Sequence, residues 1–163
     1  MRAVIATLGY VLSPDRESIL MIRRDTRPDD LHFGKYNGLG GKLETDEDVV
    51  AGMRREIAEE AGLECGPMEL AGTVSWPGFG RGGENWFGFL FRIPTWTGTP
   101  RDANDEGSLH WVRVADVLAG TVPMWESDRH FLPLVLGPAP QPFHGVMPFQ
   151  DGKAQSWSYT PMP

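Results

Sequence analysis

Apolar and polar residues alternate with a period of two over several stretches of the chain. This spacing is typical of β-strands, whose successive side chains point to opposite faces of a sheet. Turn-forming residues, such as the run Ser13-Pro14-Asp15, separate the stretches. The strands predicted in this way cover residues 3–12, 18–24, 68–76, 86–93 and 108–112, and residues 143–149 pair with 156–160 in a terminal hairpin around Asp151-Gly152.

One stretch follows the helical period instead. Its apolar stripe consists of Val49, Val50, Met53 and Ile57. Thr45 or Asp46 can cap the start of this helix, and Gly62 stops it where a left-handed residue is wanted. Shorter helices are predicted over residues 114–118 and 127–136, the second bent at its proline.

Strands interrupted by one strong helix, and followed by shorter helices and a hairpin, are typical of an α+β sandwich with a mixed β-sheet. A chain of 163 residues is long enough to bury close to ~70% of its unfolded surface. We therefore predict a single domain over residues 1–163, in which the proline-rich residues 137–142 form a stiff connector. The glycine run at residues 37–41 must bring backbone close to another group, and residues 77–83 are a candidate flexible lip.

Composition and charge narrow the functional classes. The net charge of -7 and the pI near 5.0 argue against binding to a nucleic-acid polymer. No apolar stretch approaches the length of a membrane span, and the strand pattern follows Met1-Arg2 without a signal-peptide pattern, so we expect a cytoplasmic protein. The single cysteine, Cys65, offers neither a disulfide nor metal-ligand spacing. No feature indicates an obligate protein partner.

Three glutamates fall on one face of the predicted long helix. Glu56, Glu59 and Glu60 stand at i, i+3 and i+4. Such a face is commonly solvated and laced by pairs such as Arg55 with Glu59. Three crowded carboxylates at the margin of an apolar stripe are also the hard oxygen ligands that Mg²⁺ or Mn²⁺ selects.

The glutamates belong to a longer motif that runs from Gly41 to Leu63. Its pattern is G-x5-E-x7-R-E-U-x-E-E-x-G-U, where U is a bulky aliphatic residue, and every position matches. This motif resembles the Nudix box. The resemblance implies an α/β/α sandwich in which Arg55 holds Glu47 and orients Glu56. It also implies a set of metal ligands, namely the carbonyl of Gly40 and the carboxylates of Glu56, Glu59 and Glu60.

The Nudix resemblance also implies a reaction, the cleavage of a nucleoside diphosphate linked to another moiety within its phosphate chain. Two or more Mg²⁺ ions on these carboxylates, or Mn²⁺ in their place, would neutralise the diphosphate and align a water for in-line attack. A glutamate near that water would take its proton. Glu56 and Glu60 are both candidates for this base.

Segments outside the box extend the resemblance to the MutT-like branch of the family, which hydrolyses oxidised purine nucleoside triphosphates. These segments are residues 34–42, Asp105-Glu106, residues 124–128 and residues 143–145. The resemblance implies that Asn37 and Asp128 bond the base edge while Trp125 stacks on the base. It also implies that Glu106 approaches the metals from outside the box and that Thr7 and Arg23 line the pocket. One departure is Ser127, where vertebrate members carry an aspartate.

Several of these residues also have ordinary structural interpretations. Taken alone, Trp125 could be a core residue, and Asp128 could be a negative charge at a helix N-terminus. Glu106 could lie in a solvated loop, and residues 40–41 could form a tight turn. The leading hypothesis is a Mg²⁺-dependent diphosphatase for nucleotides such as 8-oxo-dGTP, which would sanitise the nucleotide pool. One alternative keeps the chemistry with ADP-ribose, a dinucleoside polyphosphate or a pyrimidine triphosphate. Another is a non-catalytic nucleotide-binding module, which the intact glutamate set argues against.

Overall fold

A nine-stranded mixed sheet organises the molecule, for which the computed structural model describes residues 1–138 and 141–162. The strands on its main path run in the order β13-β10-β6-β7-β1-β2-β3, with β4 also paired to β1 and β9 to β2. Their bounds are β1 Val4–Leu12, β2 Ser18–Arg23, β3 Tyr36–Asn37, β4 Leu39–Lys42, β6 Glu69–Trp76, β7 Trp86–Ile93, β9 Ser108–Arg113, β10 Phe143–Val146 and β13 Ser158–Pro161. Two short pairs, β5 Glu64–Cys65 with β8 Trp96–Thr97 and β11 Phe149–Gln150 with β12 Lys153–Ala154, lie outside this sheet.

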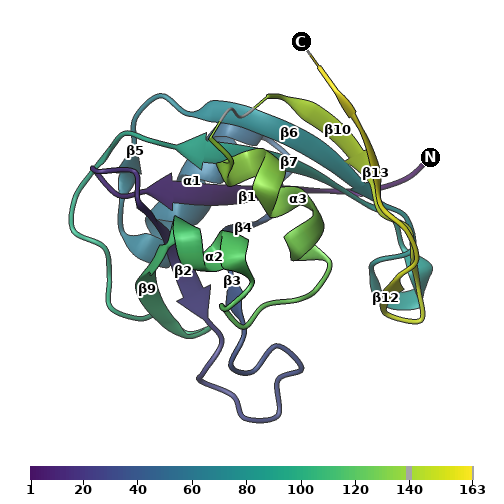
Figure 1. The fold of residues 1–163 in the computed structure, drawn as a ribbon, viewed down its shortest axis with the longest axis horizontal. Coiled ribbons are helices and arrows are strands. Elements are labelled where there is room, and N and C mark those ends of the chain that lie inside the picture. The colour runs from purple at the N-terminus through teal and green to yellow at the C-terminus, as the bar shows by residue number, and fades with distance from the viewer. Residues whose placement is uncertain (139–140, 163) are drawn as a thin grey trace.

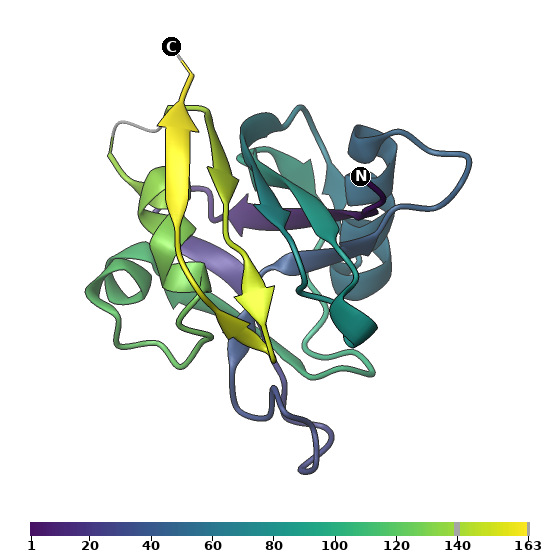
Figure 2. The same ribbon diagram turned by 90° about the vertical axis from the view of Figure 1, so that its right-hand side faces the viewer.

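Helices cover both faces of the sheet. The helix α1 (Val49–Ala61) packs on one face, while α2 (Val114–Ala119) and α3 (Asp128–Leu136) pack on the other, so the sheet lies between two helical layers (Figures 1 and 2). Alternation along β1 produces the two cores, because Tyr10 joins the cluster under α3 while its neighbour Val11 joins the cluster under α1. The predicted α/β/α sandwich with a mixed sheet is confirmed.

The central strand β1 changes partner along its length. Its residues Ala6 to Gly9 pair antiparallel with β4, whereas Val11 and Leu12 pair with β2. On its other side β1 runs parallel to β7. The glycine run is thereby laid along the first half of β1, and β4 in turn lies against α1.

Both ends of α1 are defined by caps. The Asp48 side chain accepts hydrogen bonds from the backbone N–H groups of Val50 and Ala51, so the predicted caps Thr45 and Asp46 were wrong by two or more residues. Asp46 and Thr45 lie too early because the helix begins only after Glu47 has turned back to accept the N–H of Glu44. At the other end Gly62 adopts the predicted left-handed conformation, with φ of 72°.

The buried face of α1 differs in one position from the predicted stripe. Met53 and Ile57 are fully buried, as expected, but Val50 is exposed. Gly52 and Ala61 take part in the buried face instead, and Val50, which stands in the first turn of the helix, is exposed although it lies on the same side as Ile57.

The C-terminal segment forms the predicted hairpin, and the structure places this hairpin at the edge of the sheet. Strand β10 pairs parallel with β6 and antiparallel with β13, whose four residues are all exposed. Between them β11 and β12 form the predicted turn, with Asp151 and Gly152 both at positive φ. The predicted connector over residues 137–142 has its middle, residues 139–140, outside the described part of the chain.

The glycine-rich segment 77–83, predicted as a flexible lip, is anchored through Phe79. Its ring contacts those of Trp76, Trp86 and Phe149, and the Asn85 side chain accepts the N–H of Gly78. None of the described helices is both long and apolar enough to cross a lipid bilayer.

Candidate active site

The glycine run brings backbone into direct contact with the acidic face of α1. The N–H of Gly40 donates to Glu60 Oε2 at 3.1 Å. A Cβ atom on Gly41 would lie 2.5 Å from Glu56 Oε1, so the Glu56 carboxylate occupies the space that any side chain there would need. Gly40 has φ of 153°, and a Cβ on it would lie 2.0 Å from the carbonyl oxygen of Thr7. The neighbouring atoms therefore leave no room for a side chain at either position, which is a stronger requirement for glycine than a tight turn alone.

Arg55 is the centre of an ion-pair network at the start of this face. It forms two short contacts with Glu47, from Nη2 to Oε1 at 2.6 Å and from Nε to Oε2 at 2.9 Å. Its Nη1 donates to Glu56 Oε1 at 3.0 Å and to Glu59 Oε2 at 3.3 Å. The Arg55 hydrogen bond lowers the pKa of Glu47 to about 2, and the pairing raises the pKa of Arg55 itself. The contacts expected for Arg55 with Glu47 and Glu56 are present, together with the alternative pair to Glu59.

Glu60 is the carboxylate most in need of a positive neighbour. Burial, followed by the negative charges of Glu106 and Glu56, raises its pKa to about 8. Burial also raises the pKa of Glu56, although Arg55 partly opposes this. Among the described residues no lysine, arginine or histidine forms an ion pair with Glu60. The oxygen-rich donor set and the uncompensated charge at Glu60 fit a hard divalent cation.

Glu106 lies near Glu60, in the loop between β8 and β9, and the Asn104 side chain of the same loop donates to the Glu60 carbonyl at 3.0 Å. The backbone of Glu106 is held by Thr26, which donates to its carbonyl at 3.1 Å, and by Asn104, which accepts its N–H. Its side chain is half exposed and lies 3.6 Å from Arg24. Within the described ranges, no three histidine, cysteine, aspartate or glutamate side chains already converge as a metal-holding group. The carboxylates are neighbours that a ligand would have to draw together.

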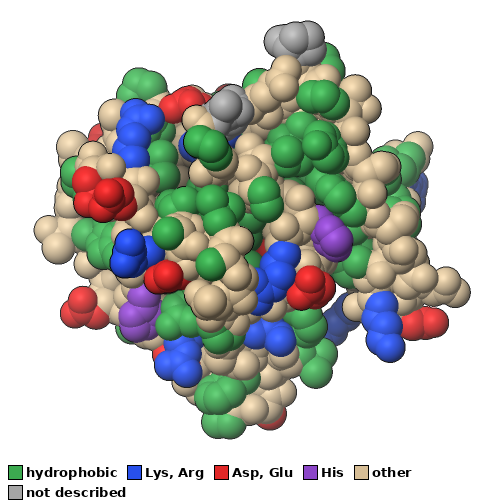
Figure 3. All heavy atoms as spheres, in the orientation of Figure 1, with side chains coloured by type: hydrophobic (Ala, Val, Ile, Leu, Met, Phe, Trp, Pro, Cys, Tyr) green, Lys and Arg blue, Asp and Glu red, His purple; other side chains and the backbone are tan. Residues whose placement is uncertain are grey.

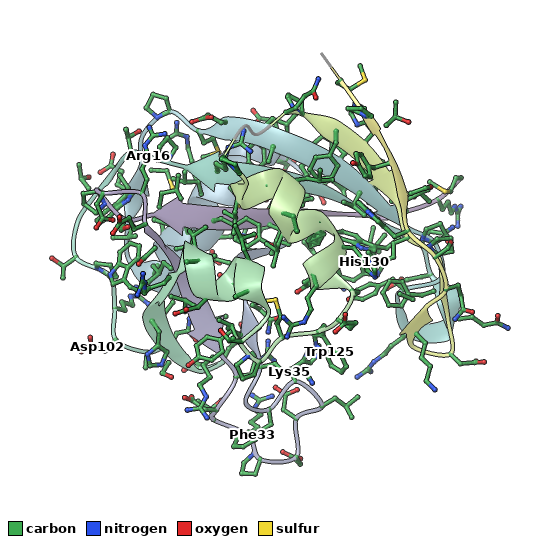
Figure 4. The ribbon with its side chains drawn as sticks, viewed as in Figure 1. Arg16, Phe33, Lys35, Asp102, Trp125 and His130 are labelled. Carbon is green, nitrogen blue, oxygen red and sulfur yellow. The ribbon has the colours of Figure 1, made fainter. Side chains whose placement is uncertain are left out.

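The predicted base-side residues lie beyond the other end of the glycine run. The N–H of Tyr36 donates to the carbonyl of Pro123 at 2.8 Å, which ties β3 to the segment carrying Trp125. Trp125 is 36% exposed and is not a core residue. Figure 4 shows Trp125 and Lys35 side by side where the loop after β2 meets the segment before α3, and the Lys35 Nζ lies 4.3 Å from the Trp125 ring centroid.

Asp128 is the first residue of α3, as its structural interpretation predicted, but its carboxyl is desolvated. Burial raises its pKa to about 7, against the opposing charge of Arg129. Its negative charge also adds to the rise in the pKa of the buried Tyr10, so the two groups are close. Tyr10 in turn packs beside Gly38, whose Cβ would lie 2.9 Å from the ring. Asp128 and Gly38, the residue after Asn37, therefore have Tyr10 as a common neighbour.

The two strand residues expected to line the pocket have different surroundings. Thr7 is buried on β1, and its hydroxyl lies 3.5 Å from the Gly41 carbonyl, beside the carboxylate site. Arg23 is exposed at the end of β2, where it lies opposite Tyr36 of β3 on one side and Ser108 of β9 on the other in the register of the sheet.

A comparison with protein-family models decides the family. The NUDIX domain model matches residues 3–135. This chain belongs to the Nudix family. Among curated proteins it is similar to an oxidized purine nucleoside triphosphate hydrolase of Danio rerio, at 30% identity over 81% of this chain and 79% of that protein. The Mus musculus protein of the same name is 29% identical over 89% and 86% of the two chains.

Solved structures agree with this family. The crystal structure of a mutator MutT protein from Bacillus halodurans matches with a TM-score of 0.82 and 25% identity, over 98% of this chain and 99% of that one. Nudix hydrolases act on phosphoanhydrides and generally use a divalent metal. The motif from Gly41 to Leu63 is thus the Nudix box of this hydrolase, and the glycine run and α1 are its structural form.

Four residues near the Nudix site were missed by sequence reasoning. They are Tyr10, Arg24, His32 and Lys35. Tyr10 is hidden in an ordinary strand pattern, Arg24 ends the predicted strand over residues 18–24, and His32 and Lys35 lie in a polar loop without hydrophobic periodicity. One local signal was available, since Asp30 can accept the N–H of the second residue after it, and this turn fixes His32.

Proposed function

We propose that this Nudix hydrolase cleaves oxidised purine nucleoside triphosphates, such as 8-oxo-dGTP, to the monophosphate and pyrophosphate with Mg²⁺, for which Mn²⁺ can substitute. The role would be sanitation of the nucleotide pool in the cytoplasm. The names of its relatives in Danio rerio and Mus musculus support this substrate class.

The observation that carries the proposal is that one short segment touches both halves of the site. Within residues 35–41, Lys35 lies over Trp125 at one end, while Gly40 donates to Glu60 at the other. A ligand that reaches both ends needs a planar group at the first and several negative charges at the second. A nucleoside triphosphate has this form, with its purine at Trp125 and its phosphates at α1.

The carboxylate half would hold the metal and the attacking water. The carbonyl of Gly40, the carboxylates of Glu56, Glu59 and Glu60, and Glu106 from the loop between β8 and β9 are the proposed ligands. A divalent ion bound there supplies positive charge to the phosphates and makes the water more acidic. Glu56 or Glu60 accepts the water proton, and Arg55 keeps Glu56 in place through the contact at 3.0 Å.

The other half would read the base. Asn37 and Asp128 together offer donors and acceptors to a purine edge, and Trp125 offers a ring for stacking. Asp128, with a pKa of about 7, can donate or accept near neutrality. The 8-oxo form carries an N7–H donor that guanine lacks, so a carboxylate acceptor distinguishes the two. Thr7 and Arg23 would contribute at the ribose and phosphate end.

The net charge of the chain and the distribution of charged side chains on its surface favour a free nucleotide over a nucleic-acid polymer as the ligand. The chain carries a net charge of -7. Figure 3 shows basic side chains interspersed with acidic ones on the face over α2 and α3, without the continuous basic stripe of a nucleic-acid binding protein.

The test is a substrate panel with purified protein and Mg²⁺. The values of kcat/KM are compared for 8-oxo-dGTP, 2-hydroxy-dATP, dGTP, ADP-ribose and diadenosine polyphosphates, with product identified as pyrophosphate or phosphate. We expect the oxidised purines to lead. A clear preference for ADP-ribose would refute the substrate assignment, and no hydrolysis of any nucleotide would favour a binding module.

Two sets of variants separate the halves of the site. Glu56→Gln and Glu60→Gln should each lower kcat by ~100-fold or more on every substrate, because they remove a ligand or the base. Asp128→Ala should instead reduce the ratio of kcat/KM for 8-oxo-dGTP over dGTP. Equal losses on both nucleotides would show that Asp128 serves only the structure.

A further inference from the structure

We propose that His32 is a positioning residue for Trp125, holding the indole ring at the angle at which its free face meets the base. The inference deepens the proposed function, since it takes Trp125 as the base platform. It assigns a role to the loop between β2 and β3, which carries no part of the Nudix box.

The contact between the two side chains is specific. The Trp125 Nε1–H donates to His32 Nδ1 at 2.6 Å. The rings meet edge to face, with centroids 5.2 Å apart and an interplanar angle of 82°. Because Trp125 is more than a third exposed, core packing does not fix its rotation. The hydrogen bond to His32 therefore sets the plane of the indole ring.

Lys35 determines which face of the ring remains available. Its Nζ lies 4.3 Å from the Trp125 ring centroid and covers one face as a cation–π partner. A base can then stack only on the opposite face. His32 at the ring edge and Lys35 on one face together restrict the side from which a purine can stack on the indole.

His32 is itself fixed by a chain of polar contacts that ends at the carboxylate half. Asp30 Oδ1 accepts the backbone N–H of His32 at 2.9 Å, and Asp30 Oδ2 pairs with Arg24 at 3.0 Å. Arg24 also lies 3.6 Å from Glu106. The loop that orients the indole is thus anchored beside the proposed metal ligands, which relates the position of the base to that of the phosphates.

The hydrogen bond requires His32 to carry no proton on Nδ1. Burial lowers the pKa of His32, Arg24 and Lys35 lower it further, and only Asp30 opposes them. The ring is therefore neutral at pH 7 and can accept the indole N–H. A protonated His32 would present a donor to a donor, and the indole would be released.

The first test compares three variants with the best nucleotide of the substrate panel. His32→Phe keeps an aromatic edge but removes the acceptor, and we expect KM to rise by ~10-fold with kcat within about two-fold. His32→Asn places an oxygen near the Nδ1 position and should recover most of the loss. His130→Phe is the matched control, because His130 stacks on another tryptophan, Trp157, at 6.3 Å, and its KM should equal that of the wild type.

A double-mutant cycle separates positioning from a general effect on the fold. In the background of Trp125→Phe, His32→Phe should raise KM no further, because the partner of the hydrogen bond is already gone. Additive losses in the two variants would overturn the proposal. So would an unchanged KM in His32→Phe alone.

A substrate-free measurement keeps this proposal distinct from the substrate assignment. The Trp125 indole N–H resonance, identified by its loss in Trp125→Phe, should move as pH falls through the His32 titration. His32→Phe should remove that movement and leave only what the neighbouring Asp128, whose pKa is raised to about 7, contributes. If this holds while the panel favours a different nucleotide, the oxidised-purine assignment fails and the positioning role stands. An indole resonance that ignores both pH and the His32 substitutions refutes the role.

Discussion

Replacing Glu60 with glutamine should stabilise the metal-free protein at alkaline pH even as it removes activity. Burial and the charges of Glu106 and Glu56 raise the pKa of this carboxyl to about 8, from an ordinary value of 4.5. Glutamine has nearly the same shape, and its carbonyl oxygen can still accept the N–H of Gly40. The substitution therefore removes the buried charge and leaves the packing in place.

The sign and the size of this change in stability follow from the linkage between proton binding and folding. Below pH 4.5 the carboxyl is protonated in both the folded and the unfolded chain, so Glu60 adds no pH dependence there. Between pH 4.5 and about 8 the folded chain holds a proton that the unfolded chain has lost, and stability falls by about 1.4 kcal/mol per pH unit. Over this pH range the ionisation of Glu60 can lower the free energy of unfolding by at most about 5 kcal/mol. Solvent screening of a partly exposed group reduces this loss to about 2 kcal/mol.

The assay is thermal unfolding in EDTA at several pH values from 5 to 9. At pH 5 the wild type and Glu60→Gln should unfold at similar temperatures, and at pH 9 the variant should unfold about 4–8 °C higher. The difference between the two proteins isolates Glu60, because Asp128, whose pKa is also raised, contributes equally to both. Adding Mg²⁺ at pH 8 should stabilise the wild type and have little effect on the variant.

Two results would refute the reasoning. A constant difference in melting temperature across the pH range would mean that the folded Glu60 carboxyl titrates at its ordinary pKa. Equal stabilisation of both proteins by Mg²⁺ would mean that the ion binds without Glu60.

Three further predictions concern the box. Arg55→Lys should lower kcat by about 10- to 100-fold and the melting temperature by a few degrees, because lysine cannot bridge Glu47 and Glu56 as the guanidinium does. Both quantities are measured on the same protein, and an unchanged kcat would contradict this prediction. Gly41→Ala should impair turnover, because its Cβ would displace the Glu56 carboxylate from Arg55. Gly40→Ala meets the Thr7 backbone and should be the more destabilising of the two, by at least about 2 kcal/mol in urea unfolding; the reverse order of destabilisation would be inconsistent with the geometry. Gly62→Ala, at φ of 72°, should destabilise by about 1 kcal/mol and leave kcat unaltered, a loss of kcat being the contrary result.

The catalytic half of the site could be predicted because its geometry is local. Glu56, Glu59 and Glu60 share a helix face because of their spacing alone. Gly62 ends that helix because glycine readily adopts the left-handed conformation needed there. The N-terminal boundary was wrong because Thr45, Asp46 and Asp48 are all residue types that can cap a helix, and the Glu47 contact with Arg55 leaves Asp48 as the cap.

The other half depends on contacts between residues far apart in sequence. Trp125 and His32 are 93 positions apart, and Thr26 and Glu106 are 80 apart. The change of partner along β1, from β4 to β2, brings these loops to the site, and no alternation of polar and apolar residues encodes that pairing. For this reason the sandwich was predictable from the sequence, while the loop that touches Trp125 was not.

The exposed strand β13 bears on whether copies of this chain can join edge to edge. An outer strand with free backbone donors and acceptors invites pairing with another molecule. Strand β13 is only four residues long, and its last member, Pro161, pairs with Phe143 of β10 and has no N–H to offer. An outer edge this short that ends in a proline is a poor template for β-sheet association, so crowding at high concentration should produce no extended sheet through this edge.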